Sequence, residues 1–320
     1  EVTAQGSADL AAETLDVAAR ASVGASTTLG TLVPPAARWA SLAIETHAAG
    51  TIAAPRIALD AAVQGFGSDT PALAAALGET PRLTLRATPP ERIDSLAIDG
   101  AALRVTAEGD VGTSLDATLR VVASDLAPLV PGLAGALQAQ ARLTGPRGDP
   151  SIALTARGER LERDGQVLEA PDLALTIATP LSAPRAEGRL RATYAGLPAT
   201  LDLQGVPEGE RLRLERLAFA FGPARLDARG VLDPRAATFV GNAALDVADL
   251  APFSALAGTP MAGRAGLRAT LDLRDGAQGF DATAELNDAR IAGAALEGRL
   301  AAQGTLAALT ASLDARADDA

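Results

Sequence analysis

The side chains that most often carry enzymatic chemistry are scarce in this sequence. It has a single His, His47, and neither Cys nor Lys, so all 28 basic residues are Arg. The lack of Cys excludes thiol nucleophiles, disulfides and thiolate metal ligands. The lack of Lys excludes Schiff-base chemistry and Walker-type phosphate loops. The composition therefore favours a binding or structural protein over an enzyme.

His47 and the carboxylates are the remaining candidates for catalysis. A Ser–His–Asp triad of the hydrolase kind would need a G-x-S-x-G elbow, which the chain lacks. We expect His47 to occupy a loop or cap position. The 39 acidic residues, including Glu13 and Asp16, are scattered along polar faces, as is typical of a solvated surface. No catalytic residue, metal site or cofactor is predicted.

Charge and hydropathy limit the partners. The formal net charge is -11, and no run of Arg forms the basic patch that phosphate backbones require. The longest uncharged stretches, 21–37 and 126–141, are interrupted by Pro and Gly. A membrane-spanning helix needs about 20 predominantly apolar residues. We therefore expect no nucleic acid partner and no transmembrane helix in this section.

The pattern that organises the chain is clearest in residues 211–233, RLRLERLAFAFGPARLDARGVLD. Apolar and polar residues alternate there with a period of two, which in a β-strand places them on opposite faces. The phase changes at Glu215 and Arg216, as a β-bulge would allow, and Gly222-Pro223 turns the chain. The pattern predicts a ribbon with one apolar and one polar face.

Variants of this ribbon recur along the chain. VTAQG at 2–6 returns as VTAEG at 105–109, and the tetrapeptide DLAP occurs at 125–128 and 249–252. We interpret 1–320 as one continuous β-repeat array, with degenerate repeats at about 1–92, 93–213 and 214–320. Since the chain begins at Glu1 without a start Met or signal-peptide pattern, we expect an internal section of a longer protein.

Turn and helix signals separate the strands. Asp-Gly pairs at 99–100, 164–165 and 275–276 predict tight hairpins, because Gly accepts a positive φ. Thr70-Pro71 before ALAAAL and Gly78 predicts one short helix. The DLAP segments and 35–43 are expected to add helical turns where the chain reverses.

Four architectures share this alternation: a sandwich, a membrane barrel, a closed solenoid and an open curled sheet. A lipid-facing barrel should carry aromatic girdles, which 2% aromatic residues do not provide. A single β-sandwich does not explain why the sequences of individual strands recur along the chain. The solenoid and the open sheet remain. We predict an all-β, elongated open curled sheet with an apolar groove and a few short helices.

The strands L-x-L-x-x-x-G and R-L-x-A-x-G, the DLAP turns and the scarcity of aromatic residues and Cys resemble a known family. It is the periplasmic β-repeat region of the TamB and AsmA-like proteins, the translocation and assembly module family. The likeness extends over the whole chain. It implies a β-taco sheet in the periplasm, anchored to the inner membrane by a segment outside this chain.

The resemblance implies a protein that conducts phospholipids between inner and outer membranes and so supports outer-membrane biogenesis. Phospholipid acyl chains would be the ligand. The alternative is a scaffold or chaperone for outer-membrane or autotransporter proteins, working with a TamA-like outer-membrane barrel protein. A surface adhesin built as a closed solenoid is a third class. The candidate groove residues are Leu201, Leu203, Leu212, Leu214, Phe219, Phe221, Leu226, Leu245, Val247, Leu271 and Leu273.

Overall fold

The alternating sequence forms β-strands along almost the whole chain. A computed structural model describes residues 1–26, 37–178, 184–305 and 307–318. Besides strands, these residues form the short helices α1 (Pro71–Leu77) and α2 (Ser254–Ala257) and the 3₁₀ turn η2 (Ala251–Phe253). The predicted all-β fold is therefore confirmed. Within the described ranges, no helix has the length and apolarity needed to cross a membrane.

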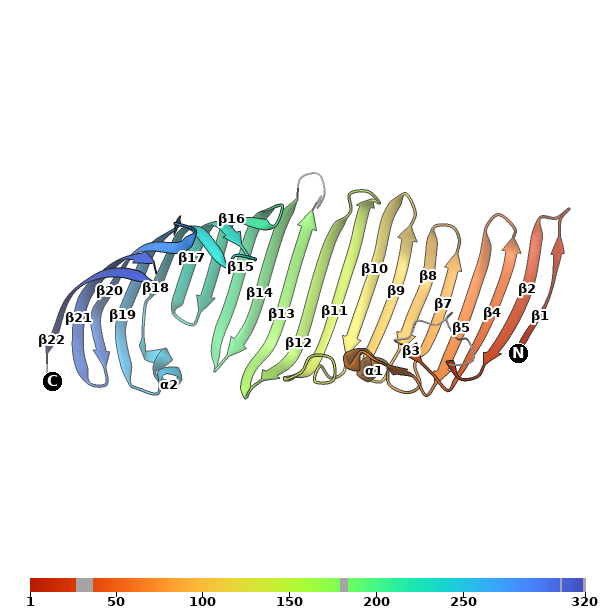
Figure 1. Ribbon diagram of the computed structural model, residues 1–320, viewed down its shortest axis with the longest axis horizontal. Helices are drawn as coiled ribbons and strands as arrows, with labels where there is room; N and C mark the ends of the chain where they lie inside the picture. Colours follow the sequence, from red (N-terminus) through yellow and green to blue (C-terminus); the bar gives the residue numbers. More distant parts are fainter. Residues whose placement is uncertain (27–36, 179–183, 306, 319–320) are drawn as a thin grey trace. The chain divides into compact units, whose positions relative to one another are not determined.

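The chain divides into two compact units, Glu1–Val167 (unit 1) and Leu168–Ala320 (unit 2). In unit 1, ten strands form an open antiparallel sheet in which neighbours in sequence are neighbours in space (Figure 1), and β3 and β6 form a separate pair. Its strands are β1 (Val2–Asp9), β2 (Thr14–Val23), β3 (Ala37–Arg38), β4 (Ser41–Thr51), β5 (Pro55–Gln64), β6 (Gly67–Ser68), β7 (Arg82–Thr88), β8 (Arg92–Asp99), β9 (Leu103–Val111), β10 (Ser114–Ala123), β11 (Leu133–Pro146) and β12 (Ser151–Arg163).

Unit 2 is likewise an open, curled antiparallel sheet of ten strands in chain order. Its first strand pairs with the second and its last with the ninth, so the sheet does not close on itself. The strands are β13 (Gln166–Ala178), β14 (Arg185–Tyr194), β15 (Leu197–Glu208), β16 (Arg211–Phe221), β17 (Ala224–Asp233), β18 (Thr238–Val247), β19 (Met261–Arg274), β20 (Ala277–Ile291), β21 (Ala294–Thr305) and β22 (Ala308–Asp318).

The predicted phase change in β16 is a β-bulge. The register of β16 with β17 shifts between Leu214 and Leu217, which pair with Gly230 and Ala228. Two residues of β16 lie opposite one residue of β17 at this bulge, so Leu214 and Leu217 stay on the same face. The apolar face thus continues through the bulge.

Two of the three predicted Asp-Gly hairpins have the expected geometry. Asp164 and Asp275 have φ of 52°, and the glycines that follow them have φ of 77° and 80°. Positive φ at both central residues is the mark of the type I′ turn. Asp99-Gly100 differs, because a longer bend there brings the Gly100 N–H to the Leu103 carbonyl at 2.9 Å.

The short helix predicted after Thr70 is confirmed as α1, which ends at Gly78 with a φ of 67°. The helical turn expected at 35–43 is wrong for the described part of that segment, which contributes β3 and the start of β4. His47 lies in the middle of β4 and not in a loop or cap, because its segment alternates and pairs on both sides.

The two DLAP segments make the same contacts in their respective units. In unit 1, Asp125 Oδ1 accepts the Ala127 N–H at 3.1 Å, and the Leu126 N–H bonds to the Gly135 carbonyl. In unit 2, Asp249 Oδ1 accepts the Ala251 N–H at 2.9 Å. The Leu250 N–H bonds to the Gly263 carbonyl in the same way. The first segment forms a turn and the second continues into η2. The DLAP sequence therefore forms a chain reversal in both units.

Candidate functional site

One face of the unit 2 sheet carries a row of apolar side chains that crosses every strand. Each residue of this row pairs directly with the next across the ladder, at the Cα level. Directly opposed side chains in an antiparallel sheet lie about 4.5–5.5 Å apart and contact each other. The apolar row consists of Leu173, Leu190, Leu201, Phe219, Leu226, Leu245, Leu267, Ala284, Leu300 and Leu313.

The structure places all eleven candidate groove residues on this same face, on β15 to β19. Four of them, Leu201, Phe219, Leu226 and Leu245, belong to the apolar row itself. The other seven lie an even number of residues away along their strands, or across the β16 bulge. The sequence did not single out Leu173, Leu190, Leu267, Leu300 and Leu313, although the alternating runs that contain them were its signal.

An alanine row runs beside the apolar row on the same face. Six residues of neighbouring strands pair in succession, and all are Ala: Ala228, Ala243, Ala269, Ala282, Ala302 and Ala311. A methyl side chain rises less from the sheet than Leu, so this row lies lower than the apolar row beside it. The next row on its other side is mixed and consists of Gly230, Gly241, Leu271, Phe280, Gly304 and Leu309.

Within the described ranges, no second sheet or layer of helices covers the apolar row. Phe219 and Leu267 are each 37% exposed, Leu300 is 39% exposed and Leu273 is 48% exposed. Leu214 and Val247 are buried, and no large side chain of the described residues is completely buried. A sealed core would bury large apolar side chains almost fully. The face is therefore open to solvent along much of its length.

The opposite face of unit 2 carries cross-strand ion pairs. Arg189 Nε donates to Asp202 Oδ1 at 2.7 Å, from directly opposed positions on β14 and β15. This hydrogen bond lowers the pKa of Asp202 below its ordinary value and raises that of Arg189. Arg264 and Asp288 form another pair at 3.0 Å. Both are exposed pairs, which typically contribute less than about 1 kcal/mol each.

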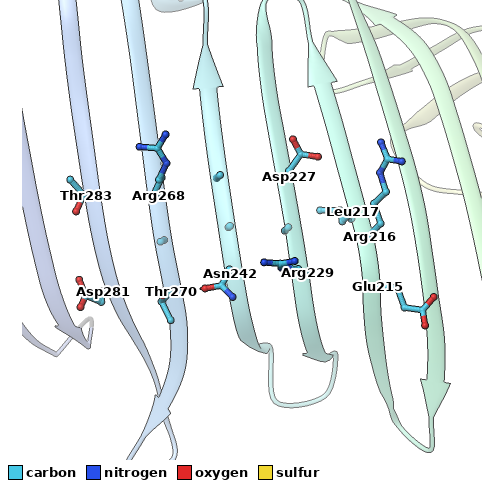
Figure 2. A pocket seen from close by; sticks show the side chains of 14 residues that line it. Glu215, Arg216, Leu217, Asp227, Arg229, Asn242, Arg268, Thr270, Asp281 and Thr283 are labelled. Carbon is cyan, nitrogen blue, oxygen red and sulfur yellow. Dashed lines mark hydrogen bonds between the residues drawn. The ribbon is translucent and has the colours of Figure 1, made fainter.

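A hollow of about 750 Å³ lies over this charged face, not over the apolar row. Figure 2 shows its side chains, which come from β16 to β20 and include Arg216, Arg229 and Arg268 beside Asp227 and Asp281. It forms because the short Ala244 lies between longer side chains, opposite Asp227 and Arg268 on the neighbouring strands. Its mixed charges suit water and polar solutes, so it is chemically distinct from the apolar face.

His47, the single His of the chain, pairs with a carboxylate. His47 Nε2 lies 2.7 Å from Asp16 Oδ1 on the neighbouring strand of unit 1, and both side chains are more than half exposed. Within the described ranges, no three or more His, Asp or Glu side chains are grouped so that they could hold a metal ion. The apolar face of unit 2 is thus the candidate functional site, and its exposed Leu and Phe side chains are chemically suited to contact with apolar groups.

Comparisons with protein-family models, curated proteins and solved structures found no match to this chain.

Proposed function

We propose that this chain binds phospholipid acyl chains on its apolar face and conducts phospholipids between the inner and outer membranes. The observation that carries the proposal is the apolar row, which crosses all ten strands of unit 2 and which no second layer covers in the described part of the chain. A large exposed apolar surface marks an interaction site. The resemblance to TamB and AsmA-like proteins supplies the setting: a periplasmic protein anchored to the inner membrane, supporting outer-membrane biogenesis.

The dimensions of the face suit acyl chains. Ten strands at about 4.8 Å spacing extend roughly 43 Å across the sheet of unit 2. One leaflet of a bilayer is about 15 Å of hydrocarbon, half of the core thickness, so the face has room for several acyl chains. The alanine row adds a low strip of methyl groups beside the apolar row, along which a flexible acyl chain can lie.

The energetics need no catalytic group. Transfer of a methylene from water to an apolar surface gains about 0.8 kcal/mol, so an acyl chain is held by many equivalent small contacts. Because neighbouring positions of the apolar row offer similar side chains, the acyl chain loses little on moving from one strand to the next. The face therefore favours lateral movement over tight binding at one point.

The direct test is to purify the chain from cells without detergent and to identify extracted lipids by mass spectrometry. Phospholipid should be recovered with the native chain and be depleted from the Leu267→Arg variant, which places a charge in the apolar row. Thr270→Arg is the matched control, because Thr270 is an exposed residue of the same strand on the opposite face. Absence of lipid from the native chain, or equal amounts in both variants, would contradict the proposal.

A further inference from the structure

The hollow over the charged face of unit 2 is lined by side chains of both charges. Its volume of about 750 Å³ lies within the roughly 300–1,000 Å³ that is typical of small-molecule sites. Figure 2 shows these side chains on neighbouring strands, around a stretch of sheet that carries short side chains. The charged residues of the lining are Glu215, Arg216, Asp227, Arg229, Arg268 and Asp281.

Most of these charges have no partner within the protein. Elsewhere on this face directly opposed residues form ion pairs, as Arg189 does with Asp202 at 2.7 Å. The charge of Arg216 contributes to the lowered pKa of Asp202. In the described part of the chain, no side-chain ion pair or hydrogen bond is formed by the other five: Glu215, Asp227, Arg229, Arg268 and Asp281.

A single alanine separates the first two opposite charges. Asp227 and Arg268 lie on either side of Ala244 in one row across the strands. Their Cα atoms are two strand spacings apart, roughly 10 Å. Because the methyl group of Ala244 is short, the space between the two charged side chains is open. A bound molecule can therefore lie on Ala244 and reach a carboxylate on one side and a guanidinium on the other.

The neighbouring row repeats this arrangement with the charges reversed. Arg229 is followed across the ladder by the neutral Asn242 and Thr270 and then by Asp281. Arg229 is also two residues from Asp227 along β17, about 7 Å away on the same face. Opposite charges thus alternate both along β17 and across the sheet, and neutral side chains hold them apart.

The bulge of β16 adds two charged side chains at the margin of the hollow. The register of β16 shifts past Glu215 in its ladders with both neighbours, so Glu215 is the extra residue of the bulge. Glu215 and Arg216 together lie opposite Arg229. A regular strand would place one side chain there. β-Bulges redirect side chains in this way and are frequent beside functional sites.

The alternation of charge limits the kind of ligand. A carboxylate only accepts hydrogen bonds, and a guanidinium only donates them. A phosphate would be repelled by the carboxylates, and an ammonium group would be repelled by the guanidiniums. A hydroxyl group both donates and accepts, so adjacent hydroxyl groups can bind to both kinds of side chain at once.

We propose that this hollow is a saccharide-binding site. Adjacent sugar hydroxyl groups donate to the Asp227 carboxylate and accept from the Arg229 guanidinium, and the apolar C–H groups of the ring lie on Ala244. The hollow and the apolar row are on opposite faces of the sheet, so this proposal does not depend on acyl binding.

Saturation-transfer difference NMR on the full chain tests the site with glucose, galactose, mannose and N-acetylglucosamine as probes. At least one of these four sugars should receive saturation from the native chain. Absence of a signal from all four overturns the proposal. Titration of the sugar that gives the strongest signal then measures its affinity for the native chain and for the variants below.

Asp227→Asn and Arg229→Gln each remove one charge from an exposed side chain and keep its shape. Each should weaken sugar binding about tenfold, because each replaces a hydrogen bond to a charged group. Arg290→Gln is the matched control, since Arg290 is an exposed residue of β20 that does not line the hollow. Native affinity in Asp227→Asn and Arg229→Gln, or an equal loss in Arg290→Gln, places the sugar elsewhere and overturns the proposal.

Inorganic phosphate separates a saccharide site from a simple anion site. Removal of the Asp227 charge takes a hydrogen-bond acceptor from a sugar but removes repulsion from an anion. Asp227→Asn should therefore bind the sugar more weakly than the native chain does. A hollow that binds phosphate and none of the sugars, or an Asp227→Asn variant that binds the sugar more tightly, would show an anion site and overturn the saccharide assignment.

Discussion

Replacing Leu267 by Arg tests whether the apolar face is open or sealed. Leu267 occupies the apolar row in the middle of β19 and is 37% exposed. Full burial of a Leu side chain is worth about 1.5–3 kcal/mol, so loss of its buried part costs about 1–2 kcal/mol at most. The Arg stem recovers some of these contacts while the guanidinium reaches water. We therefore expect a folded variant with slightly lowered stability.

Leu214→Arg is the contrasting substitution on the same face. Leu214 is 6% exposed, beside the bulge of β16 and opposite Gly230. The Leu214 site is almost inaccessible to water, and the residues directly opposite it, Gly205 and Gly230, offer no acidic partner for an Arg. An uncompensated buried charge costs about 3–5 kcal/mol, so we expect this variant to lose much of its folded population.

Urea unfolding followed by circular dichroism compares the two variants with Thr270→Arg, which should match the native chain. Acyl binding is then measured for the variants that remain folded. Leu267→Arg should fold and bind acyl chains poorly, because the guanidinium interrupts the apolar row. The reasoning is refuted if Leu267→Arg is destabilised as strongly as Leu214→Arg, since that result requires a covered face. It is also refuted if Leu267→Arg binds lipid normally.

Three further predictions follow from backbone and charge. Ala195→Asn should raise the free energy of unfolding by roughly 0.5–1 kcal/mol, because Ala195 has a φ of 51° and Asn tolerates this conformation better. Urea titration measures the change, and an unchanged midpoint would contradict this prediction. Gly230→Ala should lower the free energy of unfolding by more than about 2 kcal/mol, because a Cβ there would collide with the Val240 carbonyl. A native urea midpoint would contradict this prediction, since the sheet would then have moved to accommodate the Cβ. The pKa of Asp233 is lowered mainly by the hydrogen bond from the Ala236 N–H and then by Arg211. Ionised Asp233 therefore stabilises the fold above the unfolded-state pKa of about 4, and this stabilisation is lost as the pH falls through the pKa of the folded state. The Asp233→Asn variant should therefore be less stable than the native chain at neutral pH and equal to it in strong acid, and a constant difference across pH would refute the assignment.

The sequence alone determined the strands and their two faces. A period of two fixes which side chains share a face wherever the backbone is extended, and this needs no knowledge of strand order. The candidates from Leu201 to Leu273 could therefore be placed together correctly, including the change of phase at Glu215. The type I′ hairpins at Asp164 and Asp275 were also readable, because their geometry depends on two adjacent residues.

Only the tertiary structure decided exposure and the contacts between residues far apart in the sequence. Leu214 and Leu273 have the same place in the alternation, yet one is buried and the other half exposed, because burial depends on the neighbouring strands and the curl of the sheet. Tyr194 and Phe253 are far apart in sequence and carry no shared pattern. They meet around Phe221 because antiparallel strands bring every second connection to the same end, a fact that exists only once the strands are paired.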